Sequence, residues 1–407
     1  LYRPQSKVGT HTHHTHPSQP QKSLSYQQGG GKMVKSLIKA SLLLLLLAVL
    51  TRQCDGADTK KKKKTTSKHV IDTNKYANVC VGTSTSKTKE PYKALTAKDK
   101  RQHAALSLLI DTSSLASIKT KDSPQHKAAC WMIYDDSRKI DPRSKRGKAA
   151  FLQRYALVVL YHATNGMAWK KSDLWLSSSH ECKWAGISCY EYNFLYSGIV
   201  ERIRLSFNGL DGLLPRELSL LTDLQELDLH GNDIQGVIPH LVLVGLKSLN
   251  ILKLHMNSMF GVIPKEIGKM THLKELVLFG NYFAGKIPPE VGQLKNLEVL
   301  DVYANFLTGQ VPSQISQLSN LKELHLNDNN INGKIPDSIC KLPLLTELVA
   351  DCLGPDPEVT CSCATVCCRG LPDAKCFKLK KSPSTTTGKK TQQKKKKNTS
   401  TATKKKR

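Results

Sequence analysis

A repeat of about 24 residues in the middle of the chain constrains the fold more than any other feature. Six asparagines recur at spacings of 24, 25, 24, 24 and 24 residues: Asn208, Asn232, Asn257, Asn281, Asn305 and Asn329. Glycine follows each asparagine four residues later, and proline follows that glycine after three more. An apolar L-x-x-L-x-L frame precedes each asparagine, as in Leu273, Leu276 and Leu278. A period of this length indicates a solenoid of stacked units.

Each position of the repeat has a physical role. Alternating leucines place one face of a short strand in the core. The asparagine amide can bond backbone groups that would otherwise be buried and unpaired, so stacked repeats form a ladder. Glycine permits a tight bend, and proline fixes φ where the chain leaves for the convex side. The single 25-residue spacing has its extra residue between Pro239 and Leu249, which predicts an insertion on the convex side.

The repeat resembles the plant-type class of leucine-rich repeats, whose consensus LxxLxLxxNxLxGxIP is matched almost letter for letter by Leu273 to Pro288. The resemblance covers about residues 148–350. That class includes receptor-kinase ectodomains and secreted polygalacturonase-inhibiting proteins. It implies an α/β solenoid, a curved right-handed superhelix with a parallel concave sheet, built here from six to seven repeats over residues 199–348.

The segment before the repeats resembles the N-terminal cap of the same class. Residues 148–163 carry apolar positions at helical spacing, and Asn165-Gly166 is a helix stop. The run Cys182-Lys-Trp184-Ala-Gly-Ile-Ser-Cys189 is similar to the cap pattern C-x-W-x-G-V-x-C. The resemblance implies a cap over residues 148–198, with a disulfide between Cys182 and Cys189.

After the last repeat, cysteines replace the leucine pattern. A seventh strand begins at Leu345, but Leu353 stands where asparagine is expected. We expect a disulfide-stapled C-terminal cap over residues 349–376, similar to Cys-rich caps of secreted proteins predicted from algae such as diatoms. Zinc is the alternative, although the usual C-x2-C pairs are missing. The cysteines expected to form disulfides here are Cys340, Cys352, Cys361, Cys363, Cys367, Cys368 and Cys376.

The positive charge of the chain is confined to its flanks. The whole chain carries +28, whereas residues 150–352 hold 17 basic and 20 acidic residues. The flanks therefore hold 44 basic residues against 13 acidic ones. We expect residues 57–147 to be a basic low-complexity linker with one marginal helix at 103–118, and residues 377–407 to be a Lys-rich disordered tail. Cys80 and Cys130 could pair.

The sequence also indicates secretion. The first methionine is Met33, and we expect residues 1–32 to be upstream sequence or an extension. Residues 33–56 combine basic residues with an apolar run of 11 residues from Ala40 to Leu50, as in a secretory signal peptide. A retained anchor is the alternative, but eleven helical residues span only ~16 Å, about half a bilayer core. The protein is therefore expected outside the cell or in the cell wall.

Outward residues of the concave strands form columns, and we expect a ligand there. Exposed aromatics in adjacent repeats, namely Phe279, Tyr282 and Tyr303, favour contact with a protein or carbohydrate, although a solvated strand face is the alternative. The candidate contact residues are Arg204, Asp228, His230, Lys253, His255, Phe279, Tyr282, Asp301, Tyr303 and His325. A metal site at His230 and His255 would usually want a third ligand, for which Asp228 is only a candidate, so no metal is expected.

These features predict a recognition protein rather than an enzyme. The chain contains no complete phosphate-binding loop, kinase catalytic sequence or G-x-S-x-G motif. We expect no cofactor and no specific nucleic acid partner, and we expect the basic arms to attach to anionic polysaccharide, lipid or mineral. One alternative is a structural component of a cell wall or mineral envelope retained by those arms. Another is an inhibitor of a wall-degrading enzyme, by fold-level analogy only.

Overall fold

The computed structural model describes residues 76–81, 96, 98–190, 198–353, 359–361, 363–369 and 376–378. All of them belong to one compact unit within residues 69–407. The expected upstream segment (residues 1–32), the expected signal peptide (33–56) and the Lys-rich tail beyond residue 378 lie outside the described residues. In the part of the chain that is described, no helix is both long and apolar enough to cross a membrane.

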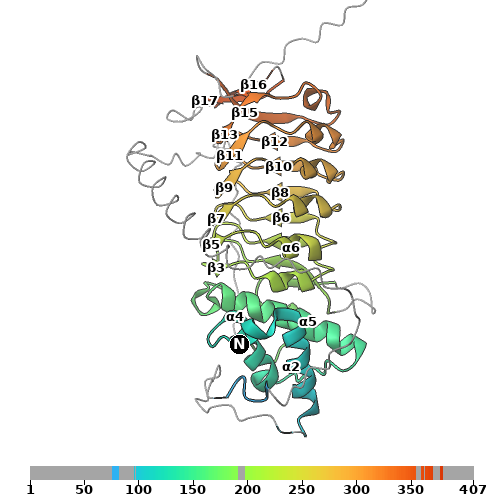
Figure 1. The fold of residues 1–407 in the computed structure, drawn as a ribbon. Helices are drawn as coiled ribbons and strands as arrows, with labels where there is room; N and C mark the ends of the chain where they lie inside the picture. The colour runs from blue at the N-terminus through green and yellow to red at the C-terminus, as the bar shows by residue number, and fades with distance from the viewer. Residues whose placement is uncertain are drawn as a thin grey trace, which may run out of the picture. The chain divides into compact units, whose positions relative to one another are not determined.

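Helices precede the repeats. They are α2 (Lys100–Ser113), α3 (Leu115–Lys119), α4 (Pro124–Cys130), the π-helical turn η3 (Trp131–Asp135) and α5 (Lys145–Ala163). Serine side chains cap three of these helices, since Ser114, Ser123 and Ser144 each accept the N–H of the residue three positions on. Figure 1 shows these helices at the end of the solenoid where the repeats begin.

The expectation of a disordered linker over residues 57–147 is wrong for residues 98–147. Helix α2 buries Leu106 and Leu109 in the same core as α5, and the Cys80–Cys130 disulfide ties the turn at 76–81 to α4. The expected helix over 103–118 starts earlier and breaks at Ser114, whose φ of 73° ends α2 before α3 begins. The many Lys, Ser and Thr residues hid these helices because they occupy caps and the outer faces.

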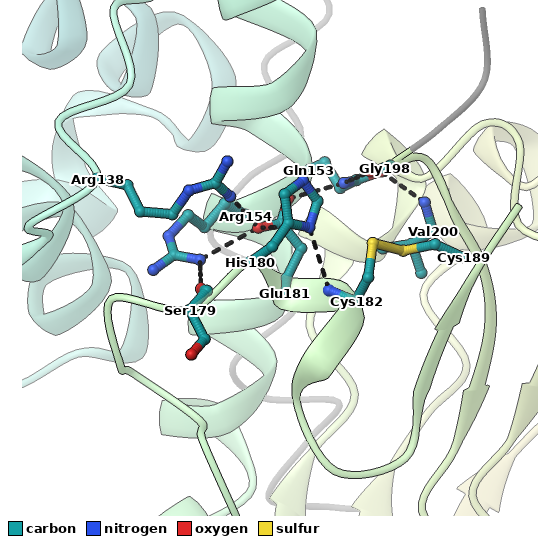
Figure 2. The surroundings of a disulfide bond; sticks show 10 residues. All are labelled: Arg138, Gln153, Arg154, Ser179, His180, Glu181, Cys182, Cys189, Gly198 and Val200. Carbon is teal, nitrogen blue, oxygen red and sulfur yellow. Dashed lines mark hydrogen bonds and ion pairs between the residues drawn. A yellow bond between two sulfur atoms is a disulfide. The ribbon is translucent and has the colours of Figure 1, made fainter. Parts of the chain in front are cut away.

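A buried ion cluster joins α5 to the N-terminal cap. Arg154 is fully buried, and its guanidinium contacts the carboxylates of Asp136 at 3.0 Å and Glu181 at 3.1 Å. Arg138 also reaches Glu181, at 2.7 Å, as Figure 2 shows. The Arg154 guanidinium lies 4.7 Å from the centroid of the Trp184 ring. Buried charges are tolerated when they are paired and hydrogen-bonded, as they are here.

The N-terminal cap closes the first edge of the concave sheet. Strand β1 (Ile187–Cys189) pairs antiparallel with β2 (Val200–Arg204), the first strand of the repeats. Cys182 and Cys189 form a disulfide beside this pair (Figure 2). The antiparallel pairing covers backbone groups that an open solenoid end would leave unpaired.

The repeats form the predicted solenoid with a parallel concave sheet. After β2 its strands are β4 (Glu226–Asp228), β6 (Ile251–Lys253), β8 (Glu275–Val277), β10 (Val299–Asp301), β12 (Glu323–His325) and β15 (Glu347–Leu353). Figure 1 shows them stacked in chain order. Their middle leucines are register partners, and all are buried. These leucines form the apolar spine that each repeat shares with its neighbours.

Two further layers complete each repeat. A second parallel sheet contains β3 (Asp211–Leu213), β5 (Asp233–Gly236), β7 (Ser258–Gly261), β9 (Tyr282–Gly285), β11 (Phe306–Gly309) and β13 (Asn330–Ile331). The convex side carries 3₁₀ turns η6 (Arg216–Leu220), η7 (Lys265–Lys269), η8 (Pro289–Gln293), η9 (Ser313–Gln317) and η10 (Ile339–Lys341). The 25-residue repeat has an α-helical turn there instead, α6 (His240–Gly245), so the extra residue lies on the convex side.

The asparagines lie at the bends between the two sheets, and all six are buried. Each side-chain amide from Asn232 to Asn329 donates to backbone carbonyls of its own repeat and of the repeat before it. Each carbonyl oxygen accepts a backbone N–H of the preceding repeat, as from Phe283 to Asn305 at 3.0 Å. Asn208 instead bonds the backbone of Lys171 in the cap. The ladder thus links every repeat to its predecessor.

Disulfides staple the C-terminal cap. Cys340 pairs with Cys363 and Cys352 with Cys367, while Cys368 is also disulfide-bonded. The expectation of a disulfide at Cys361 is wrong, because its thiol is free. Strands β16 (Val359–Thr360), β17 (Val366–Arg369) and β18 (Cys376–Lys378) belong to the cap, where β17 and β18 extend the concave sheet beyond β15 and β16 pairs with β14 (Gly333–Lys334). The Cys376 side chain lies outside the described residues.

Candidate ligand-binding face

Three columns of outward side chains cover the concave sheet, because residues on either side of each buried leucine point away from the core. The first column contains Arg202, Glu226, Ile251, Glu275, Val299, Glu323 and Glu347. The second contains Arg204, Asp228, Lys253, Val277, Asp301, His325 and Val349. The third contains Ser206, His230, His255, Phe279, Tyr303, Asn327 and Asp351. Sequence analysis identified the second and third columns and missed the first.

The rings of the third column stack on one another across four repeats. We call His230, His255, Phe279 and Tyr303 the aromatic column. Successive ring centroids lie 4.2, 4.3 and 4.5 Å apart, with interplanar angles of 9°, 27° and 18°. Ring faces are therefore covered by neighbouring rings, and the column presents ring edges to the space above the sheet. Such edges carry partial positive charge.

The stack changes the exposure expected for the aromatic residues. Phe279 and Tyr303 are only partly exposed because each stacks on a neighbouring ring, whereas Tyr282 is 37% exposed. Tyr282 stands at the start of β9, in the second sheet, where its ring pairs with Phe306 at a centroid distance of 6.0 Å. The concave sheet thus holds the four-ring column, whereas Tyr282, expected on the same face, belongs with Phe306 to a separate pair in the second sheet.

Sequence reasoning also missed Phe207 and Met256, which are 55% and 48% exposed. Both occupy the position before the asparagine, with φ of 51° and 54° in the left-handed region. The Phe207 ring meets His230 edge to face at 4.8 Å and extends the aromatic column by one repeat. Gly231 makes room for it, since a Cβ there would lie 2.4 Å from the Phe207 ring. Aligning the repeats at the position before the asparagine would have identified both residues.

Charges near the N-terminal end of the face are paired. Arg204 makes two hydrogen bonds of 2.7 and 2.6 Å to the Glu226 carboxylate. Lys253 pairs with Glu275 at 2.8 Å. Both glutamates lie two residues before the second-column residue of their own strand. Because every second residue of a strand points to the same side, the sequence could have predicted that they share the concave face.

Charges near the C-terminal end are mostly acidic. The His325 imidazole lies 3.3 Å from the carboxylate of Asp301 and 3.8 Å from that of Glu347. The hydrogen bond to Asp301 raises the pKa of His325, against the opposing effect of burial. Within the described residues, no Lys or Arg lies within ion-pair distance of Asp301, Glu323 or Glu347.

The two stacked histidines differ in their surroundings. His230 hydrogen-bonds the Asp228 carboxylate at 2.6 Å. Burial, together with the neighbouring His230, lowers the pKa of His255 to about 4. The nitrogen lone pairs lie in the ring planes, and these planes are nearly parallel at 9°, so the two rings cannot converge on one metal ion. The geometry therefore favours contact with a ligand over metal binding at this pair.

Cysteine geometry bears on the zinc alternative as well. Two groups bring three potential ligand atoms together: His180, Cys182 and Cys189, and Cys340, Cys361 and Cys363. In each group two of the sulfurs form a disulfide with one another. A disulfide sulfur is not a thiolate ligand, so these groups are disulfide sites.

Family models identify the repeats. A leucine-rich repeat region model matches residues 265–361, and a single leucine-rich repeat model matches residues 223–243. None of the curated proteins compared with the chain matches it significantly.

Solved structures similar to the chain include plant receptor ectodomains. The leucine-rich-repeat ectodomain of the receptor kinase GASSHO1/SCHENGEN3 from Arabidopsis thaliana, in complex with CASPARIAN STRIP INTEGRITY FACTOR 2, is 31% identical over 40% of this chain and 19% of that one, with a TM-score of 0.36. The Arabidopsis receptor kinase HAESA, in complex with the peptide hormone IDA and the co-receptor SERK1, is 28% identical over 49% and 33%, with a TM-score of 0.43.

The smaller BIR2 ectodomain from Arabidopsis thaliana is 26% identical over 48% of this chain and 97% of its own length, with a TM-score of 0.40. The chain spans only 19–27% of the length of the first three similar structures. The family matches agree with the repeat spacing, the parallel concave sheet and the buried asparagines. The chain contains leucine-rich repeats, which the family models match over residues 223–243 and 265–361.

Proposed function

We propose that this protein recognises an extracellular ligand, a protein or a glycan, on the concave face of its solenoid. The disulfides of both caps support the extracellular assignment, because such bonds persist in oxidising compartments. The contact residues would be those of the aromatic column, together with Tyr282 and the flanking charges of Arg204, Asp228, Lys253, Asp301 and His325.

The aromatic column is the observation that carries this proposal. Four stacked, partly exposed rings run across adjacent repeats of the concave sheet. Aromatic side chains are enriched among the residues that dominate binding, and the edges of these stacked rings face outward. Their ring edges, next to paired carboxylates and cations, offer both apolar contact and hydrogen bonds to an extended ligand.

The test compares the full chain with its F279A/Y303A variant on arrays of peptides and of oligosaccharides. Losing two central aromatic contacts should weaken binding of any captured compound at least about tenfold, since such residues often contribute 2 kcal/mol or more. The matched control is V262A, which trims a 58% exposed aliphatic side chain directly after β7. Equal binding by all three proteins would contradict the proposed face.

A second candidate function is structural, with the protein retained in a wall or mineral envelope by its basic arms. The charge of the flanks, 44 basic residues against 13 acidic ones, supports it. Binding to a polygalacturonate matrix should then fall steeply with salt, because exposed charges are screened. Removing residues 379–407 should reduce retention, whereas F279A/Y303A should not; the opposite pattern would favour the concave face. Inhibition of a wall-degrading enzyme is a third hypothesis, by fold-level analogy only.

A further inference from the structure

The concave face changes in charge along its length. In the repeats nearer the N-terminal cap, Arg204, Lys253 and their glutamate partners form ion pairs. In the last three strands of the repeats, the first and second columns hold Asp301, Glu323 and Glu347. Among the described residues, the only basic group within ion-pair distance of these carboxylates is the His325 imidazole, which is charged only when protonated. We call these three carboxylates the acidic end. The nearest lysine in the sequence, Lys322, pairs with Glu298 instead, at 2.6 Å.

The register of the sheet places like charges together. Glu323 and Glu347 are Cα partners in the β12–β15 pair, so both side chains stand on the same face of neighbouring strands. Like charges directly opposite one another destabilise a sheet. The Glu347 side chain is 48% exposed, so a cation arriving from solvent can reach it. This end of the face is therefore poised to accept positive charge from elsewhere.

The C-terminal part of the chain offers that charge at the same edge of the sheet. The concave sheet ends in the order β12–β15–β17–β18, and β18 ends at Lys378. The 29 residues that follow, 379–407, contain twelve Lys and Arg and no Asp or Glu. Three strand spacings of ~4.8 Å separate β18 from β12. Twenty-nine residues can extend over ~95 Å, so the tail is long enough to turn back over the acidic end.

We propose that the Lys-rich tail, residues 379–407, binds the acidic end of its own concave face. Charge complementarity and the short tether support this occupant over a free polycation, because a covalent tether supplies an effective concentration in the millimolar range. The tail then competes with any cationic ligand for the last three strands and leaves the aromatic column open. The interaction is electrostatic and is expected to weaken with salt.

Zero-length carbodiimide cross-linking of the full chain tests the proposal directly. The reagent joins a carboxylate to a contacting lysine, and peptide mapping then identifies the pair. We expect links from Glu323 and Glu347 to lysines of the tail. The ion pairs Lys322–Glu298 and Lys334–Asp337, at 2.6 and 2.8 Å, serve as internal positive controls. Formation of the control links without any tail link would overturn the proposal.

Mixing isotopically light and heavy copies before cross-linking identifies the occupant. Links within one copy are expected. Links found only between light and heavy copies would overturn the proposal, because the bound tail would then belong to a second molecule.

A labelled peptide of residues 379–407 provides an affinity test that does not depend on cross-linking. A chain ending at Lys378 should bind it at least about tenfold more tightly than the full chain, whose own tail occupies the site. In the shortened chain, E323Q/E347Q should reduce affinity about tenfold, whereas the control E298Q should not. Equal affinity for the full and shortened chains, or no effect of E323Q/E347Q, would overturn the proposal. F279A/Y303A should leave peptide affinity unchanged, which separates this test from that of the proposed function.

Discussion

The two ends of the solenoid are closed in different ways. The N-terminal end is covered by helices and by the cap segment that follows them, and their large side chains, such as Phe151 and Tyr155 of α5 and Trp184 of the cap segment, are fully buried near the Arg154 ion cluster. The C-terminal cap is made of short strands with few large apolar residues and several disulfides. An open repeat stack must be capped at both ends. Here one end relies on burial of apolar surface and the other on covalent crosslinks.

The largest expected effect tests the N-terminal cap. R154A leaves the carboxylates of Asp136 and Glu181 buried without their central partner, which should reduce the free energy of unfolding by about 3–5 kcal/mol. Chemical denaturation followed by circular dichroism would measure it. The control R143A removes an exposed partner of Asp141 and should change nothing measurable. A loss below about 1 kcal/mol for R154A would show that the ion cluster does not hold this cap together.

A somewhat smaller, local effect is expected at the C-terminal cap. C352S/C367S opens a crosslink between residues 15 positions apart, which should destabilise the cap by about 3 kcal/mol. Hydrogen exchange should speed up in β15 and β17 and stay unchanged in α5, because repeats interact mainly with their nearest neighbours. Equal loss of protection in α5 would mean that the two caps are not independent.

The smallest expected effect is a pH dependence of stability, which compares the two ends of the concave face. The pKa of His255 is lowered to about 4 by burial, so its contribution to stability is lost as pH falls from ~6.5 toward 4. The pKa of His325 is raised by Asp301, so its contribution is present below ~6.5 and is lost as pH rises through the raised value. Each effect should be about 1 kcal/mol or less, because both side chains are partly exposed.

Denaturation midpoints of H255Q and H325Q at pH 5 and pH 8 would measure these effects. Relative to the parent protein, H255Q should be more stable at pH 5 than at pH 8, and H325Q should show the reverse. The same pH trend in both variants would contradict the different environments described for the two halves of the face.

The repeat architecture could be predicted because each position that recurs in the repeats performs one physical task. Asparagine, glycine and proline recur at fixed intervals, so the bends and the concave strands follow from spacing alone. Outward columns follow from the period of two along a strand. The family resemblance to plant-type repeats agrees with the architecture found.

Other features depend on neighbours that the spacing does not reveal. The stacking of His255 between His230 and Phe279 is set by ring orientation across three repeats. Of the helices over residues 100–135, only one over 103–118 was expected, because Lys, Ser and Thr residues at caps and outer faces obscure the apolar pattern of the others, and the break at Ser114 was not foreseen. Cysteine pairing cannot be deduced from sequence when several partners are available, and so the free thiol of Cys361 was not anticipated.

Asp351, which follows the last asparagine of the ladder, limits the number of repeats. Strand β15 continues to Leu353 instead of bending, and the Asp351 carboxylate accepts the N–H of Asn329. A carboxylate has no amide hydrogens to offer, whereas each earlier rung donates to the coil before it. Duplication of an internal repeat would therefore keep the asparagine contacts between neighbouring repeats. A repeat added after β15 would instead follow a repeat that has no asparagine amide. Growth of such a protein over evolution is expected from within the stack and not from its end.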